Sequence, residues 1–184
     1  MNDNIRVIHL EKKHVPHVAD AERALCSTSY EYPPGAPLTG TIRIPQPWAW
    51  NEEWITEAAS RFASKDGMLD TRARVAQVKM PALDTRAGKQ EGQWVPAGGM
   101  LYEIGNSKYE ILLLTVNTQV VPLEKAEGLP SGNEVLKALL DVVMDKAKAS
   151  SKCTEVSIHV PDGHWPLVKF FQGLGWKPTL VRDY

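Results

Sequence analysis

One pattern in the second half of the chain constrains the fold more than any other. Residues 111–114 are continuously apolar, which is typical of a central strand buried on both faces. Ser131 and Glu134 then form a capping box immediately before a helical stripe of apolar residues. Residues 154–160 alternate like a half-buried strand, and a short helix is expected over 165–174. Strand, helix, strand and helix in this order predict a mixed α/β sheet with helices on its faces.

The beginning of the chain has the same alternation of strand and helix. Residues 5–10 alternate as a strand does, in a register that the pattern leaves open by one residue. A helix is expected over 14–27, with Pro16 in its first turn, where a missing N–H is no loss. The expected core-facing residues of this helix are Val15, Val18, Ala21 or Glu22, and Leu25.

The middle of the chain contains a segment rich in proline and aromatic residues, over 30–50. A loop of this length in a compact domain is often functional, so we expect a flap whose aromatic rings pack on the core or shape a substrate site. The candidate substrate-binding residues in it are Tyr32, Trp48 and Trp50.

The segments that follow the flap read as one helix and three strands. The helix is expected over 51–64, and a strand over 72–79. Residues 84–93 are polar and are expected to be exposed. Strands at 100–104 and 110–116 are joined by a turn, which indicates a hairpin.

The composition is that of an ordinary globular protein. A length of 184 residues predicts a single domain over residues 1–184. Lys plus Arg number 21 and Asp plus Glu 22, and the net charge of -1 favours neither nucleic acid nor an anionic membrane as partner. The longest uncharged apolar run is too short and polar to span a bilayer, and the N-terminus lacks the order of a secretory signal. We therefore expect a cytoplasmic protein.

Cysteine and histidine spacing does not predict a metal site. The two cysteines, Cys26 and Cys153, are far apart and form no Cys-x-x-Cys pair, so neither a disulfide framework nor a cysteine-built zinc site is expected. His14 and His17 have a spacing that suits a metal pair, but no third ligand is near them in sequence. We expect them to be surface histidines.

The connection between residues 116 and 136 is a strand, a glycine-containing loop and a capped helix. Unpaired amides and the positive end of the dipole make a helix start suitable for phosphate, although such a unit is also a common plain connection. Pro130 has no N–H to offer. The candidate donors are the backbone amides of Gly128, Leu129, Ser131, Gly132 and Asn133.

Residues 114–140 and 156–176 resemble the acyl-CoA-binding half of the GNAT superfamily of N-acyltransferases. The family's R/Q-x-x-G-x-G/A loop is matched by Lys125, Gly128 and Pro130. The family's N-x-x-A-x-x-F-Y-x-x-x-G-F block is matched by His164, Leu167, Phe170, Phe171, Gly175 and Trp176. His164 stands at the Asn position of that block and Phe171 at its Tyr position.

The resemblance implies a GNAT-like fold: a central mixed, mostly antiparallel sheet of about six or seven strands with helices on both faces. It implies acetyl-CoA or another acyl-CoA as cofactor, with its pyrophosphate on the loop amides. The pantetheine would pair with the main chain at Leu114 and Val116, and Phe171 would face the cofactor. The implied activity is direct transfer of an acyl group, most simply acetyl, to a small amine.

The resemblance also suggests which residues carry the reaction. Glu110 matches the position of the general base, although it also fits an exposed charge at a strand end, and Glu103 is a second candidate. The phenyl ring of Phe171 cannot donate a proton, which leaves His164 or solvent as the general acid.

Two alternatives to acyl transfer remain open. The chain could be a GNAT-fold protein that has lost acetyl transfer and catalyses another reaction on a small molecule, or a non-catalytic binding protein. In each case we expect a monomer or a homodimer.

Overall fold

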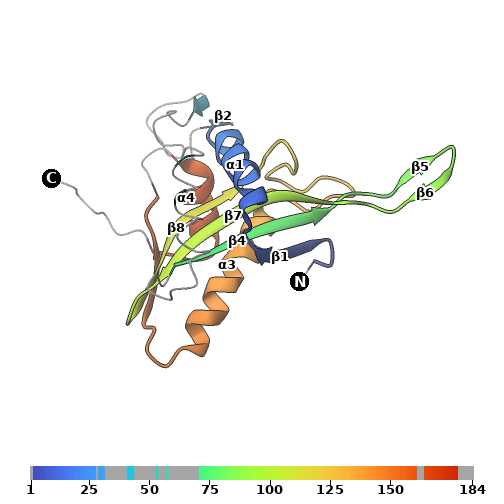
Figure 1. Cartoon of the computed structure of the whole chain (residues 1–184). Helices are drawn as coiled ribbons and strands as arrows, with labels where there is room; N and C mark the ends of the chain where they lie inside the picture. Colours follow the sequence, from blue (N-terminus) through green and yellow to red (C-terminus); the bar gives the residue numbers. More distant parts are fainter. Residues whose placement is uncertain are drawn as a thin grey trace.

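The computed structural model describes residues 2–27, 29–31, 41–43, 53, 57, 71–160 and 164–177. The centre of this part of the chain is a five-stranded sheet in the order β1-β4-β7-β8-β9 (Figure 1). Neighbouring strands are antiparallel except β8 and β9, which are parallel, so the predicted mixed and mostly antiparallel sheet is confirmed. The strands are β1 (Ile5–His9), β4 (Thr71–Lys79), β7 (Trp94–Ile104), β8 (Lys108–Val116) and β9 (Glu155–Ile158).

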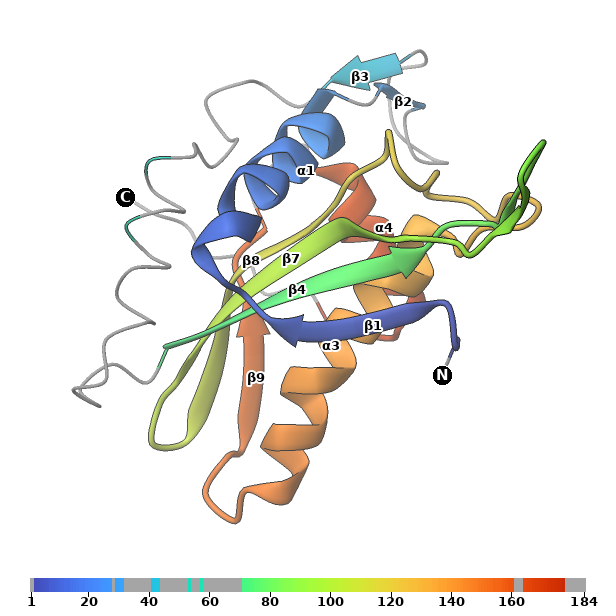
Figure 2. The same cartoon turned by 45° about the vertical axis from the view of Figure 1, so that its right-hand side comes forward.

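Helices cover both faces of the sheet, as expected (Figure 2). After a 3-10 turn, η1 (Lys12–His14), helix α1 (Val15–Ser27) packs on β7 and β8. Helix α3 (Gly132–Ala149) covers the other face, and α4 (Trp165–Gly173) follows β9. The capping box predicted for α3 is present: the Ser131 hydroxyl accepts from the Glu134 N–H at 3.1 Å, and the Glu134 carboxylate accepts from the Ser131 N–H at 2.7 Å.

Two adjacent glycines in β7 let both helices approach the sheet closely. A Cβ at Gly99 would lie 2.7 Å from a methyl group of Val18 in α1. A Cβ at Gly98 would lie 3.2 Å from a methyl group of Val135 in α3, on the opposite face. Since successive strand residues point to opposite faces, this pair places α1 and α3 on the two sides of the sheet.

The two faces carry separate apolar clusters. The larger cluster, on the α3 face, also includes Leu25 of α1 and residues of α4. Among its members are Met100, Tyr102, Leu136, Leu139, Leu140 and Phe170. The smaller cluster, on the α1 face, contains Val15, Val18, Ala19, Ala73, Val75, Leu101 and Leu113. Ile5 and Val7 of β1 contact the first cluster, and Ile8 and Leu10 contact the second, so the register that the sequence left open is resolved.

A β-bulge at Leu112 divides β8 into two parts. Ile111 lies opposite Tyr102 of β7, but Leu101 lies opposite Leu113, so Leu112 is the extra residue. The bulge shifts the alternation by one residue: Ile111 and Leu114 both face α3, while Leu113 faces α1. The apolar run 111–114 therefore packs on both faces, as predicted, although Leu112 itself is only partly buried.

The structure differs from the sequence-based expectations at His14 and in the segment 84–93. His14, expected at the surface, is buried, and its Nδ1 accepts the Glu11 N–H at 3.0 Å, which holds the entry to α1. The polar segment 84–93 is exposed as predicted, but it contains a hairpin of β5 (Leu83–Thr85) and β6 (Gly88–Gln90). This hairpin ends a long arm that continues β4 and β7 away from the sheet (Figure 1).

Part of the expected organisation lies outside the described residues. At the start and in the middle of the proline-rich segment, β2 (Ser29–Glu31) and β3 (Thr41–Arg43) pair antiparallel. The remainder of the flap lies outside the described residues, and so does the helix expected over 51–64 apart from two positions. Among the described helices, none has the length and hydrophobicity needed to cross a bilayer.

Replacing Gly99 tests the close packing of α1 on the sheet. The Gly99→Ala variant should be less stable by about 1–3 kcal/mol, because the new methyl group overlaps Val18 in a packed core. Urea denaturation followed by circular dichroism measures this difference. Gly173→Ala is the matched control, since a Cβ there meets nothing within 4 Å, and its stability should be unchanged or slightly higher. Equal stability of the two variants would contradict this account.

Candidate functional site

The sheet opens between β8 and β9. Their pairing ends at Ile111, which lies opposite Ile158, although β8 continues to Val116. Over 112–116, no strand of the described chain pairs with β8 on the β9 side. A strand edge of this kind can accept an extended ligand through main-chain hydrogen bonds. Leu114 and Val116, predicted at the cofactor, contribute this main chain while their side chains are buried in the core.

Two exposed carboxylates lie at the closed end of this opening. Glu110 of β8 lies directly opposite Glu103 of β7, and on its other side it lies opposite Ser157 of β9. Like charges directly opposite each other repel, so a bound cation would stabilise the pair. Glu110 points to the α1 face because its neighbour Ile111 points to the α3 face. The predicted base is thus exposed next to the bulge and beside a second carboxylate.

The loop that leads into α3 is folded onto itself. The N–H of Gly132 donates to the Pro122 carbonyl at 2.6 Å, and that of Asn133 donates to the Leu123 carbonyl at 3.3 Å. A Cβ at Gly132 would lie 3.1 Å from the Leu123 Cα, so the beginning and the end of this loop are in close contact. Two of the amides predicted to bind pyrophosphate are therefore already used by the loop.

The other predicted donors are also engaged or lie in an exposed turn. The Ser131 N–H donates to the Glu134 carboxylate, and the Leu129 N–H donates weakly to the Ala126 carbonyl at 3.5 Å. Gly128 is exposed, with a φ of 77° that completes the Ala126–Leu129 turn. In this conformation, four of the five predicted amides (Leu129, Ser131, Gly132 and Asn133) donate within the chain.

Glu134 places a negative charge where an anion would bind. The hydrogen bond from the Ser131 N–H, more than any other interaction, lowers the pKa of Glu134, so the carboxylate is ionised at neutral pH. Asn2 adds a contact of 3.4 Å to the same carboxylate. The positive end of the α3 dipole is thus neutralised by the chain itself.

Phe171, predicted to face the cofactor, is part of the aromatic core of α4. Its ring makes an edge contact with Phe170, at 5.2 Å between centroids, and a tilted contact with Trp176 at 4.7 Å. The side chain is buried among the residues that pack α4 on the α3 face of the sheet. The described contacts of Phe171 are thus with aromatic and apolar side chains.

A second group of polar side chains is buried between α1, β8 and α4. Glu22 and Cys26 lie on α1, Thr115 on β8, and His164 immediately before α4. The Cys26 thiol donates to the Glu22 carboxyl at 3.5 Å. The Thr115 hydroxyl favours the ionised Glu22 carboxyl but makes no hydrogen bond of normal geometry within the described chain.

Burial shifts the pKa values of Glu22, Cys26 and His164. Desolvation raises the pKa of Glu22, and it also raises the pKa of the Cys26 thiol, with a further contribution from Glu22. Desolvation lowers the pKa of His164 to about 4, so its imidazole is neutral at pH 7. A neutral imidazole is suited to binding a metal or accepting a proton, and less suited to the general-acid role predicted for it.

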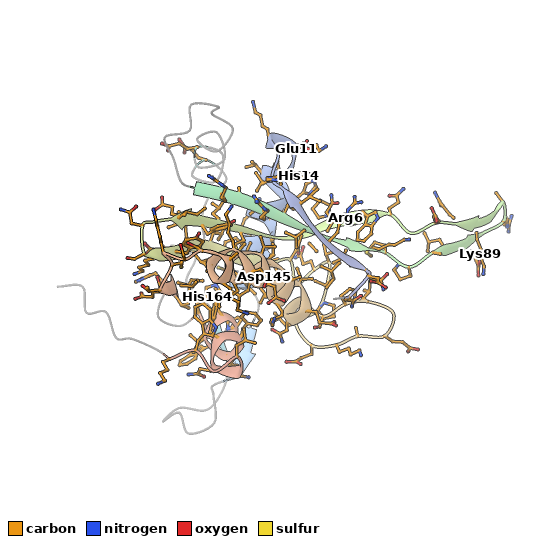
Figure 3. The ribbon with its side chains drawn as sticks, turned by 90° about the horizontal axis from the view of Figure 1, so that it is seen from below. Arg6, Glu11, His14, Lys89, Asp145 and His164 are labelled. Atoms are coloured by element: carbon orange, nitrogen blue, oxygen red, sulfur yellow. The ribbon has the colours of Figure 1, made fainter. Side chains whose placement is uncertain are left out.

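The structure does not bring Glu110 and His164 together. His164 lies with Glu22, beside Thr115 in the last part of β8. Thr115 lies five positions after Glu110 along the strand, which corresponds to roughly 15 Å. Figure 3 shows His164 by α4, remote from Lys89 near the tip of the arm.

The predicted aromatic substrate residues Tyr32, Trp48 and Trp50 lie outside the described residues. Conversely, Glu22 and Cys26 were not among the functional candidates predicted from the sequence. Their spacing of four residues on one helix face was the available signal, but the third member, His164, is distant in sequence and only the fold brings it near.

No protein-family profile matches the chain, and no curated protein is similar to it in sequence. Solved structures of N-acetyltransferases do superimpose on it. Aminoglycoside N-acetyltransferase AAC(6')-Iy in complex with CoA has a TM-score of 0.55 at 14% identity, over 98% of this chain and 92% of that one. The PaiA N-acetyltransferase of Thermoplasma acidophilum with coenzyme A has a TM-score of 0.55 at 14% identity, over 94% and 89%.

The chain has the GNAT fold. The ribosomal-protein-S18-alanine N-acetyltransferase of Escherichia coli shares it, with a TM-score of 0.51 at 15% identity, over 97% of this chain and 81% of that one. At this level of identity the GNAT comparison establishes the fold, and the resemblance suggested by the sequence motifs is confirmed to that extent.

The capping box at the start of α3 should make stability depend on pH. Because the pKa of Glu134 is lowered in the folded protein, its carboxylate stabilises the fold above its unfolded pKa, and this contribution is lost as the pH falls through the folded pKa. Wild type should be more stable than Glu134→Gln by about 0.5–1 kcal/mol at pH 7, and the difference should shrink below about pH 4. Urea denaturation across this pH range measures it.

Glu124→Gln is the control for this measurement, because Glu124 is exposed and lies outside the capping box. Its stability should stay close to that of wild type at pH 7. A difference between wild type and Glu134→Gln that does not change with pH would show that the ionised carboxylate is not what stabilises the helix start.

Proposed function

We propose that this GNAT-fold protein is an N-acyltransferase that transfers an acyl group, most simply acetyl, from an acyl-CoA to a small amine. The observation that carries the proposal is the unpaired edge of β8 over 112–116, directly beyond the exposed Glu110. An acyl-CoA supplies an activated carbonyl on a thiol leaving group, and its pantetheine arm has the amides that a strand edge can pair with.

In this proposal the main chain of β8 positions the acyl donor and the carboxylates position the amine. An amine is protonated at neutral pH, and Glu103 and Glu110 together attract it as a cation. Glu110 accepts one proton from the ammonium group, and the resulting neutral nitrogen forms the bond to the acyl carbon as the bond from carbon to sulfur breaks. The nitrogen then releases its second proton to solvent. The leaving thiolate takes its proton from solvent, since Phe171 offers none.

We also propose that the acceptor carries several amino groups. Structural neighbours of this chain are named for aminoglycosides and for spermidine, which are small molecules with several amino groups. Two opposed carboxylates suit such a polycation better than a singly charged amine. Spermidine and an aminoglycoside are therefore the first acceptors to test.

A second candidate function is favoured by the closed loop before α3. Because its amides donate within the chain and Glu134 occupies the helix start, a pyrophosphate can bind there only after the loop opens. A GNAT-fold protein that does not open this loop would catalyse another reaction on a small molecule, or bind one without reaction.

Glu110→Gln tests the base. With acetyl-CoA and spermidine or an aminoglycoside, the variant should lower kcat at pH 7 by about 100- to 10,000-fold. The loss should be smaller at high pH, where the amine is already deprotonated. Release of the free thiol measures the rate.

Glu103→Gln is the matched variant across the strand pair. Because Glu103 attracts the amine without taking its proton, this variant should raise KM and leave kcat nearly unchanged. If Glu103→Gln instead lowers kcat and Glu110→Gln does not, the roles of the two carboxylates are reversed. An unchanged rate in both variants would remove them from the mechanism.

Glu134→Gln tests whether the chain itself opposes the pyrophosphate. Gln keeps the capping box but removes the charge, so the variant should bind CoA about 2- to 5-fold more tightly than wild type. Pantetheine, which lacks the pyrophosphate, should bind both proteins equally. Calorimetric titration measures these affinities. If neither protein binds CoA at millimolar concentration, acyl transfer from CoA is contradicted and the second candidate function is retained.

A further inference from the structure

Three side chains with metal-binding atoms meet inside the molecule. They form a group separate from the two carboxylates of β7 and β8. Glu22 and Cys26 lie one helical turn apart on α1, and His164 is the residue before α4. Their donor atoms all lie within 4.8 Å of one another. The exposed fractions of these residues are 3% for Glu22, 0% for Cys26 and 2% for His164.

Apart from the Cys26–Glu22 contact, the cluster contains three buried polar atoms without a hydrogen-bond partner in the described part of the chain. Among the described residues, nothing pairs with either ring nitrogen of His164 or with Oε2 of Glu22. Buried polar atoms in native proteins are almost always paired, with protein groups, water or an ion, because an unpaired one is strongly destabilising. A buried histidine with both nitrogens unpaired therefore points to a bound species between the three residues.

We propose that Glu22, Cys26 and His164 bind a divalent transition-metal ion of the zinc class, which joins α1 to the start of α4. Thiolate, imidazole and carboxylate are the three ligand types that Zn²⁺ takes in proteins. Magnesium and calcium are disfavoured because they require oxygen ligands throughout. Thr115, whose buried hydroxyl lies beside Glu22, adjoins the coordination site.

The charges of the proposed ligands match the ion. Ionised Glu22 and Cys26 with neutral His164 carry two negative charges, which a divalent cation cancels inside a site that water does not reach. Without a cation, two adjacent buried anions are unfavourable.

The distances require only local movement. Ligand atoms around a tetrahedral zinc ion are separated by about 3.5 Å, given bond lengths of about 2.0–2.3 Å. The three donor atoms here lie within 4.8 Å of one another. Side-chain rotations that move each atom by about 1 Å would bring all three to bonding distance of one ion. Glu22 and Cys26 have the four-residue spacing that places both on one face of a helix.

Cobalt titration of the chelator-treated full-length protein tests the proposal. Wild type should bind one Co²⁺ per chain and develop a thiolate-to-cobalt charge-transfer absorption. Excess Zn²⁺ should remove this absorption and should raise the thermal unfolding midpoint of the metal-free protein by about 5–10 °C. These readouts do not depend on any enzymatic activity.

The two cysteines provide a matched pair of variants. Cys26→Ser should lose the charge-transfer absorption and the thermal shift, whereas Cys153→Ser should keep both, because Cys153 lies outside the cluster. Glu22→Gln and His164→Gln should each weaken Co²⁺ binding by at least about tenfold. If wild type shows no thiolate absorption, or if Cys26→Ser retains it, the site is disproved. The wild-type spectrum decides this even where a variant does not fold.

Discussion

The extra residue at Leu112 is the feature on which the candidate site depends. It allows one strand to bury apolar side chains against α3 before and after the bulge, while it shifts which residues face α1. It also coincides with the point where β9 leaves β8, immediately after Ile111. The apolar burial on both faces and the open edge of β8 therefore change at the same point of the strand. Glu110 lies at the last position before this change.

The candidate site combines an available strand edge with a closed loop, and the two favour different functions. The edge of β8 suits a ligand with amides, such as a pantetheine arm. The start of α3 has its own anion in Glu134 and its own acceptors in the carbonyls of Pro122 and Leu123. The loop therefore stabilises the fold at the position where other proteins could bind a phosphate, and the balance between these uses determines which function the GNAT fold serves here.

The sequence was sufficient for the elements whose signals are local. The capping box at Ser131, the hairpin of β7 and β8, and the apolar run 111–114 were all predicted, because each depends on neighbouring residues. Contacts between distant segments could not be predicted. The pairing of Gly132 with Pro122 and the burial of His14 depend on how the chain returns on itself.

The roles given to the candidate site residues stay predictions, and their arrangement could not be derived from the sequence. The family resemblance suggested Glu110, but its position directly opposite Glu103 required the register of the hairpin. The meeting of Glu22 with His164 required the packing of α1 against the start of α4, which no local pattern encodes. His164 could be singled out from the sequence because it stands at the Asn position of the resembled GNAT block. Its burial, which lowers the pKa of the imidazole, depends on the fold.

The arm formed by β5 and β6 has a practical consequence. Its hairpin pairs with itself, and Leu83 is 66% exposed, so its tip contributes little to the core. Because the entropy of closing a loop grows only slowly with length, a peptide inserted at the tip between Thr85 and Gly88 should leave the sheet intact. The arm is thus a natural handle for attaching a fluorophore or a surface anchor at a distance from the opened edge of β8.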